Sequence, residues 1–127
     1  MDLKEQNYPA NCPPPSAKPV NGVYYRLCYN RVVSPKDFLT HVELGKPFPP
    51  DKLCEACALS FFRSLKKISS YQRRHPKRFE KMVIIQFHIT EEWGIGEEKG
   101  GHLNLWQAKS DNYIDLCRGY KEVKSNE

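Results

Sequence analysis

Few residues of this sequence stand in a pattern that could do chemistry. Cys54-x-x-Cys57 has the spacing of half a zinc site, or of a redox pair whose first thiolate is stabilised at a helix start. No second CxxC and no HxxxH completes a set of four ligands, so Cys28, Cys117, His41 or His102 would have to converge on the pair. We therefore expect buried, inert cysteines and no metal, with zinc at Cys54 and Cys57 as the alternative.

A glycine-rich segment, GIGEEKGG, superficially resembles a phosphate-binding loop. It lacks the terminal GKS or GKT, and no helix is expected after it, so a mobile hairpin loop is the better interpretation. His88 lies within an apolar run, where a single histidine is more often a half-buried, hydrogen-bonded group than a catalyst. The nearby acids (Glu91, Glu92, Glu97 and Glu98) are expected in a solvated loop that could also dock on a basic surface.

The formal charge of +5 arises from one stretch of the chain. Eight of the 20 Lys and Arg residues lie between Arg63 and Lys81 with Glu80 as the single acid, so the rest of the chain is slightly negative. Such a stretch could bind nucleic acid, using Tyr71 and Phe79 for stacking, or an acidic protein, or it could be a solvated helix face. The candidate partner-binding residues are Arg63, Lys66, Lys67, Arg73, Arg74, Lys77 and Arg78.

Two helices are expected to position these residues. Ser34, Pro35 and Asp37 form a start signal for a helix that Gly45 would end. Ser64 can cap a second helix that runs to about Arg74, with its basic residues on one face and its apolar residues on the other.

The remaining periodic segments read as strands. Alternating or apolar runs with many β-branched and aromatic residues predict strands near 23–29, 59–62, 82–90, 102–107 and 117–123. The segment 91–101 is expected to connect two antiparallel strands, and 111–116 to form a turn or short helix. The predicted fold is α+β, a small, mostly antiparallel sheet with about two helices packed against it.

The length of 127 residues fits a single domain. We expect a flexible proline-rich arm over 1–21, the domain over 22–123 and a tail over 124–127. No apolar run reaches membrane-spanning length and the first residues lack a secretory signal, so the prediction is a cytoplasmic protein with no membrane partner. An odd number of cysteines, five, agrees with free thiols in a reducing compartment.

The succession Tyr25-Arg26, Ser34-Pro35-x-Asp37-Phe38, Leu59-Ser60-x-Phe62 and Gly101-His102-x-x-Leu105-Trp106 resembles a family of small bacterial proteins without an established function. The resemblance covers about residues 22–123. A fainter similarity, carried by Tyr25-Arg26 and Leu59-Ser60-x-Phe62, is to ADP-ribosyltransferase-like and RES-type folds.

This second similarity implies an NAD pocket. Arg26 would bind phosphate, Ser60 would position the nicotinamide ribose, and His102 or Gln107 would lie on the third strand. Such transferases need a glutamate on a late strand, and here Glu122 is the one late-strand acid. The alternative roles are structural, with Arg26 paired to an acid and Ser60 and His102 tying the sheet together.

From the sequence we therefore predict a binding or regulatory module for an anionic partner, a nucleic acid or an acidic protein, through the basic helix and Arg26. The alternative is a nucleotide or NAD pocket of a transferase-like enzyme or pseudoenzyme, with Arg26, Ser60 and His102 as ligand-binding residues. The sequence specifies neither the oligomeric state nor the identity of the ligand.

Overall fold

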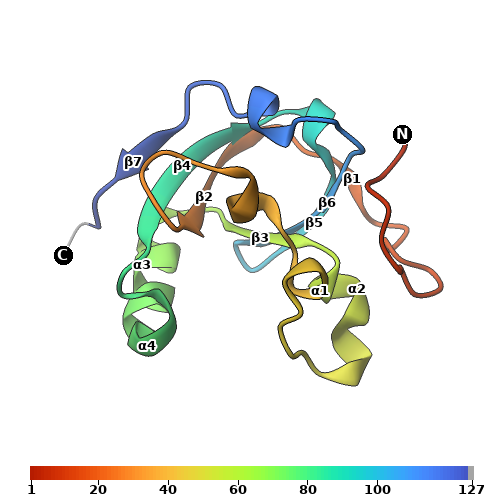
Figure 1. Cartoon of the computed structure of the whole chain (residues 1–127), viewed down its shortest axis with the longest axis horizontal. Helices are drawn as coiled ribbons and strands as arrows, with labels where there is room; N and C mark the ends of the chain where they lie inside the picture. The colour runs from red at the N-terminus through yellow and green to blue at the C-terminus, as the bar shows by residue number, and fades with distance from the viewer. Residues whose placement is uncertain (126–127) are drawn as a thin grey trace.

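A computed structural model describes residues 1–125 of the chain. Within them, seven strands form one antiparallel sheet in the order β1-β5-β6-β3-β2-β4-β7 (Figure 1). The predicted α+β class is confirmed. The strands are β1 (Lys18–Pro19), β2 (Gly22–Cys28), β3 (Leu59–Phe62), β4 (Val83–Ile89), β5 (Gly94–Lys99), β6 (His102–Gln107) and β7 (Lys121–Val123).

The helices are short, and α3 (Leu65–Arg74) is the longest of those described. The others are α1 (His41–Leu44), α2 (Leu53–Ala56) and α4 (Pro76–Phe79), with 3₁₀ turns η1 (Pro35–Phe38), η2 (Pro50–Lys52), η3 (Glu91–Trp93) and η4 (Tyr113–Leu116). Both helix pairs, α1 with α2 and α3 with α4, lie below the sheet in the view of Figure 1. None of the helices in residues 1–125 is long and apolar enough to cross a membrane.

The sheet divides between β2 and β3. β2 pairs with β4 over its full length, from Gly22 opposite Ile89 to Cys28 opposite Val83. With β3 it shares the single residue pair Tyr25 and Phe62, and the two strands run in different directions in Figure 1. β2, β4 and β7 therefore form one half of the sheet, and β3, β6, β5 and β1 form the other.

Aromatic side chains fill the core beneath this division. Trp93 is fully buried, and its ring lies within 6.2 Å of those of Phe38, Phe61, Phe87 and Tyr113, mostly edge to face. Such pairs stabilise beyond the burial of their area.

The segment expected as one helix over 35–44 is broken in two. Leu39 and Thr40 are extended, and Thr40 starts α1 by accepting a hydrogen bond of 3.2 Å from the Glu43 backbone N–H. The Glu43 carboxylate in turn accepts one of 3.0 Å from the Thr40 N–H. This capping box is a second helix-start signal inside the segment that was expected to form one helix. A new helix therefore begins after Thr40.

The segment 91–101, expected as a loop, contains β5. Gly94 and Gly96 interrupt the apolar alternation by which a strand is recognised in a sequence. Both positions need glycine because neighbouring atoms approach the backbone closely. A Cβ at Gly96 would lie 2.8 Å from side-chain atoms of Leu103 and Val20. Gly100 and Gly101 make the hairpin turn with φ of 58° and 81°, conformations that favour glycine.

The N-terminal segment 1–21, expected as a flexible arm, packs on the domain. Leu3 forms an antiparallel bridge with Ala108, and β1 pairs with β5. The physical reason is that its few apolar residues, among them Leu3 and Tyr8, cover the cluster around the buried Trp106. Of the tail predicted over 124–127, residues 126–127 lie outside the described part.

Free thiols were expected throughout, and for two cysteines this is wrong. Cys12 is bonded to Cys54, because folding of the N-terminal segment onto α2 brings their Cα atoms to 5.6 Å. Cys28, Cys57 and Cys117 are free and buried, as predicted. In the disulfide, Cys54 offers no thiolate to zinc, and no group of three or more potential ligands gathers within residues 1–125.

Candidate functional site

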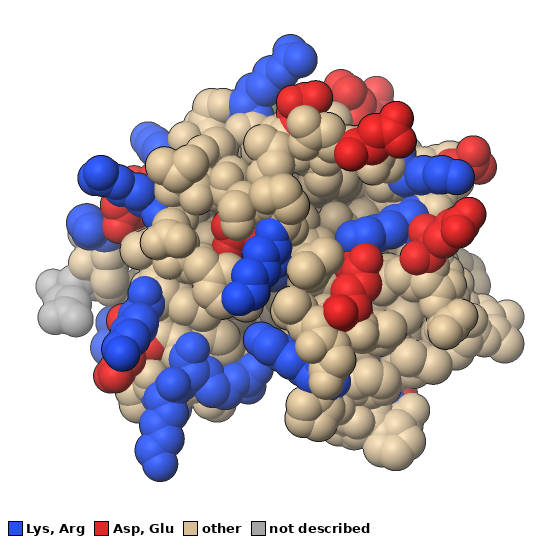
Figure 2. Space-filling view, in the orientation of Figure 1, with Lys and Arg blue, Asp and Glu red and all other residues tan. Residues whose placement is uncertain are grey.

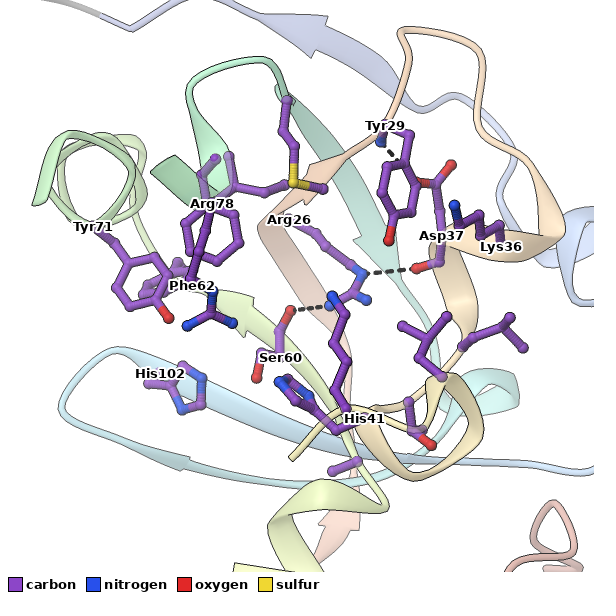
Figure 3. Close-up of a pocket in the computed structure, with 18 of the residues that line it drawn as sticks. Arg26, Tyr29, Lys36, Asp37, His41, Ser60, Phe62, Tyr71, Arg78 and His102 are labelled. Carbon is purple, nitrogen blue, oxygen red and sulfur yellow. Dashed lines mark hydrogen bonds between the residues drawn. The ribbon is translucent and has the colours of Figure 1, made fainter. Parts of the chain in front are cut away.

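A cavity of about 920 Å³ opens where the sheet divides. Its floor comes from β2, β3 and β6, and its walls come from η1 and α1 on one side and from α3 and α4 on the other (Figure 3). The volume lies in the upper part of the range for small-molecule sites. The cavity therefore follows from the strand arrangement, because it occupies the gap where β2 and β3 do not pair.

Arg26 lies at the centre of the gap. Its guanidinium donates one hydrogen bond of 2.8 Å to the Ser60 carbonyl and another of 3.0 Å to the Asp37 carbonyl (Figure 3). Its Cζ also lies 5.6 Å from the centre of the Phe61 ring. Burial lowers the pKa of this guanidinium. The alternative structural role predicted that Arg26 would pair with an acid. Its guanidinium instead binds two carbonyl oxygens and no carboxylate.

The sequence prediction that Arg26, Ser60 and His102 lie on neighbouring strands agrees with the sheet order β2, β3, β6. All three line the cavity. His102 packs edge-on against Phe62 with ring centres 5.3 Å apart, and burial lowers its pKa. Gln107, the other candidate on the third strand, lies at the far end of β6 outside this lining.

Asp37 is the one acidic residue among the described residues that line the cavity. One carboxylate oxygen accepts the Tyr29 N–H at 2.9 Å, and the other accepts the Ser34 N–H, also at 2.9 Å. Both oxygens are therefore committed to holding η1 against the end of β2. The carboxylate is a structural anchor, and the free charges of the cavity are positive.

Four further basic residues line the cavity, and no sequence pattern predicted them together in one site: Lys36, His41, Lys46 and Arg78. Burial lowers the pKa of His41 and of Lys46, and repulsion from Arg78 and Arg26 adds to both shifts. Lys46 and Lys36 follow no motif, and only the tertiary structure brings them to Arg26.

Aromatic rings form the wall on the α3–α4 side. Tyr71 lies between Phe62 and Phe79, with ring centres 5.1 Å and 5.3 Å apart, and all three line the cavity. His75 stacks on Tyr71 at 4.7 Å, just outside. Arg78 lies over Phe79 with its Cζ 4.8 Å from the ring centre. A planar ligand would therefore meet flat faces on one side and cations on the other.

The basic residues predicted from the sequence lie in three different places. Arg78 lines the cavity, whereas Lys66, Lys67, Arg73, Arg74 and Lys77 are exposed on α3 and α4 outside it. Figure 2 shows Lys and Arg side chains gathered over the lower left of the view, where α3 and α4 lie in Figure 1. Arg63 instead covers the Tyr24 ring and lies 4.0 Å from Glu98.

Other candidate residues lie away from the cavity. His88 was expected to be half-buried but is exposed, and its Nε2 lies within hydrogen-bond distance, 3.2 Å, of the Asn21 side-chain oxygen. Glu122 pairs with Lys124 on the outer strand β7 and does not line the cavity. Of the acidic cluster, Glu98 reaches toward Arg63 and accepts a hydrogen bond of 2.6 Å from Tyr24.

Comparisons with protein-family models, with curated proteins and with solved structures returned no match for this chain.

Proposed function

We propose that this protein binds a phosphate-bearing organic ligand of the nucleotide class in the cavity between the two halves of the sheet. Arg26 and Arg78 would face the phosphates, together with Lys46. The aromatic wall of Phe62, Tyr71 and Phe79 would face the base. The observation that carries the proposal is the gathering of unpaired cations around one cavity.

These cations have no carboxylate partner among the described residues. Among residues 1–125, none of the ion pairs involves Arg26, Lys36, Lys46 or Arg78. Like charges held close together reduce stability, and the lowered pKa of Lys46 records burial and the repulsion of its neighbours. An anion in the cavity would turn this repulsion into attraction, and groups with shifted pKa values that gather in a cleft are typical of functional sites.

The side-chain types suit an anionic group such as phosphate. A guanidinium presents several N–H donors in a planar fork that matches phosphate oxygens, and two such groups, from Arg26 and Arg78, line the same cavity. Two donors of Arg26 are used by the carbonyls of Ser60 and Asp37, which leaves others for a ligand. These carbonyl bonds hold the guanidinium in place before a ligand arrives, so little entropy is lost on binding.

Transferase chemistry on NAD remains the alternative. It would require a carboxylate near the nicotinamide ribose, and Asp37, the acid in the described lining, has both oxygens bound to backbone N–H groups. We therefore favour binding over catalysis.

Calorimetric titration with ADP tests the proposal, with adenosine as the uncharged control ligand. We expect ADP to bind at least ten times more tightly than adenosine. Lys46→Ala and Arg78→Ala should each weaken ADP binding about tenfold, as for the loss of one charge-assisted hydrogen bond. Both side chains are exposed on loop or helix surface, so these variants should fold. Lys121→Ala, on the outer strand β7, is the matched control.

The proposal fails if ADP binds no better than adenosine, or if the cavity variants behave like Lys121→Ala. NAD belongs in the same titration. Release of nicotinamide from NAD would establish the catalytic alternative and would call for a search for its acid.

A further inference from the structure

The surface of α3 and α4 outside the cavity has no assigned role in nucleotide binding. It carries Lys66, Lys67, Arg73, Arg74 and Lys77, all exposed. None of them is in an ion pair within residues 1–125, and Glu80, at the end of α4, is the single acid of the segment. The positive charge of this surface is therefore available to a partner.

Arg78 joins this surface to the cavity. It belongs to α4, it lines the cavity, and it follows Lys77 in the chain. Figure 3 shows Arg78 on the same side of the cavity as Phe62 and Tyr71. A ligand that reached Arg78 from inside the cavity could continue onto the exposed cations without a break in positive charge.

The corner between α3 and α4 is held by Gln72. Its side-chain amide donates a hydrogen bond of 2.8 Å to the Phe79 carbonyl and one of 2.9 Å to the Met82 carbonyl. These bonds fix the position of α4 relative to the last turn of α3, where Arg73 and Arg74 lie. The cations of the surface therefore keep a set position relative to the cavity, as expected of a binding surface built for an extended partner.

The aromatic rings specify the chemistry of that partner. A solvated basic face or a surface for an acidic protein has no need of rings beside its charges. Here Tyr71 lies on the same helix as Arg73 and Arg74, and its ring lines the cavity between Phe62 and Phe79. Cations that follow a phosphate backbone, beside aromatic rings that accept bases, are the combination that holds single strands.

We propose that the cavity and the α3–α4 surface together bind a single-stranded nucleic acid, with one nucleotide in the cavity and neighbouring phosphates on α3 and α4. The inference rests on the proposed nucleotide site and deepens it. A paired base is stacked inside a duplex and cannot enter a cavity at a sheet division, so the strand must be single at that point. An α-helix of ten residues is about 15 Å long, enough to lie along several nucleotides.

The test compares two probes on the same variants. The first is ADP, and the second is a fluorescein-labelled single strand of twelve thymidines, followed by fluorescence anisotropy at several salt concentrations. Arg73→Ala/Arg74→Ala should weaken binding of the oligonucleotide 10- to 100-fold and leave ADP affinity within twofold. The slope of log affinity against log salt should fall by about 1.4, since each phosphate contact on a single strand contributes about 0.7. Lys18→Ala/Lys121→Ala removes two exposed charges from the outer strands β1 and β7, and should change neither probe.

Four results would overturn the inference. The first is that the oligonucleotide fails to bind, and the second is that the two double variants weaken its binding equally. The third is that a duplex of the same length binds as tightly as the single strand. The fourth is that polyglutamate of equal charge displaces the oligonucleotide as well as an unlabelled single strand does. The last result would assign the surface to an acidic protein. If ADP still binds in any of these cases, the nucleotide site stands alone. If the oligonucleotide binds but ADP does not, and Lys46→Ala leaves oligonucleotide binding unchanged, the cavity proposal fails. The basic surface then remains as a binding surface.

Discussion

The Arg26 guanidinium donates a hydrogen bond of 2.8 Å to the Ser60 carbonyl across the point where β2 and β3 separate. Beyond Tyr25 and Phe62 the two strands share no further residue pair, so a side chain takes the place of a backbone partner. This one contact links the architecture to the site. It gives the Ser60 carbonyl a hydrogen-bond donor where the sheet divides. The remaining donors of Arg26 are directed into the cavity.

We expect Arg26→Ala to lower the free energy of unfolding by about 3 kcal/mol, because the carbonyls of Ser60 and Asp37 lose their donor. Urea unfolding followed by tryptophan fluorescence measures the change. Arg118→Ala, at an exposed position, is the control and should change stability by less than about 0.5 kcal/mol. Equal stability of the two variants would show that the carbonyls find other partners.

The carboxylate of Asp37 is expected to be a structural anchor. Asp37→Ala removes the acceptors of the Tyr29 and Ser34 N–H groups, and Asp37 itself is buried. We expect a loss of about 2 to 3 kcal/mol in unfolding free energy, and amide hydrogen exchange at Tyr29 and Ser34 should become faster. Asp111→Ala, an exposed acid, serves as the comparison, and unchanged exchange in Asp37→Ala would contradict the assignment.

The disulfide between Cys12 and Cys54 predicts a dependence of stability on reductant. The two cysteines are 42 residues apart, and closing a loop of that size stabilises the folded state by about 4 kcal/mol in the chain-entropy description. A reducing agent should therefore lower the Tm of the native protein. Cys12→Ser/Cys54→Ser should unfold at the same temperature with or without reductant. Five titratable thiols in the unfolded, unreduced protein, instead of three, would show that the bond does not form.

Two cavity histidines predict how stability depends on pH. Burial lowers the pKa of His41 and of His102 in the folded protein, and Lys46 and Arg78 add to the shift at His41. The unfolded chain, whose histidines titrate near 6.5, therefore binds more protons below that pH, and the free energy of unfolding falls as the pH drops. We expect His41→Gln/His102→Gln to lose less stability than the wild type between pH 7 and about pH 5.

Urea unfolding at both pH values measures this difference. His88→Gln changes an exposed histidine outside the cavity and should keep the pH dependence of the wild type. If the double variant and the wild type lose the same stability on acidification, the two rings are not held neutral by the fold.

Local patterns predicted much of the fold. The apolar alternation around Arg26 and Ser60 indicates β2 and β3, and the Ser64 cap with the apolar face of Ile68 indicates α3 with its cations outward. These features depend on neighbours in the chain, and side-chain period and capping act over a few residues. Three site residues on successive sheet strands could also be proposed, because each lies within such a segment.

Only the tertiary structure decided what lies beside them. The division of the sheet, the pairing of Cys12 with Cys54 and the convergence of Lys46 and Arg78 on Arg26 all join residues that are far apart in the sequence. Hydrophobic burial sets these contacts, and it is non-directional, so no short pattern records which distant segments meet. The sequence by itself determined a cationic helix beside a sheet, and packing around the buried Trp93 determined that the helix faces a cavity with positive charges on its other side.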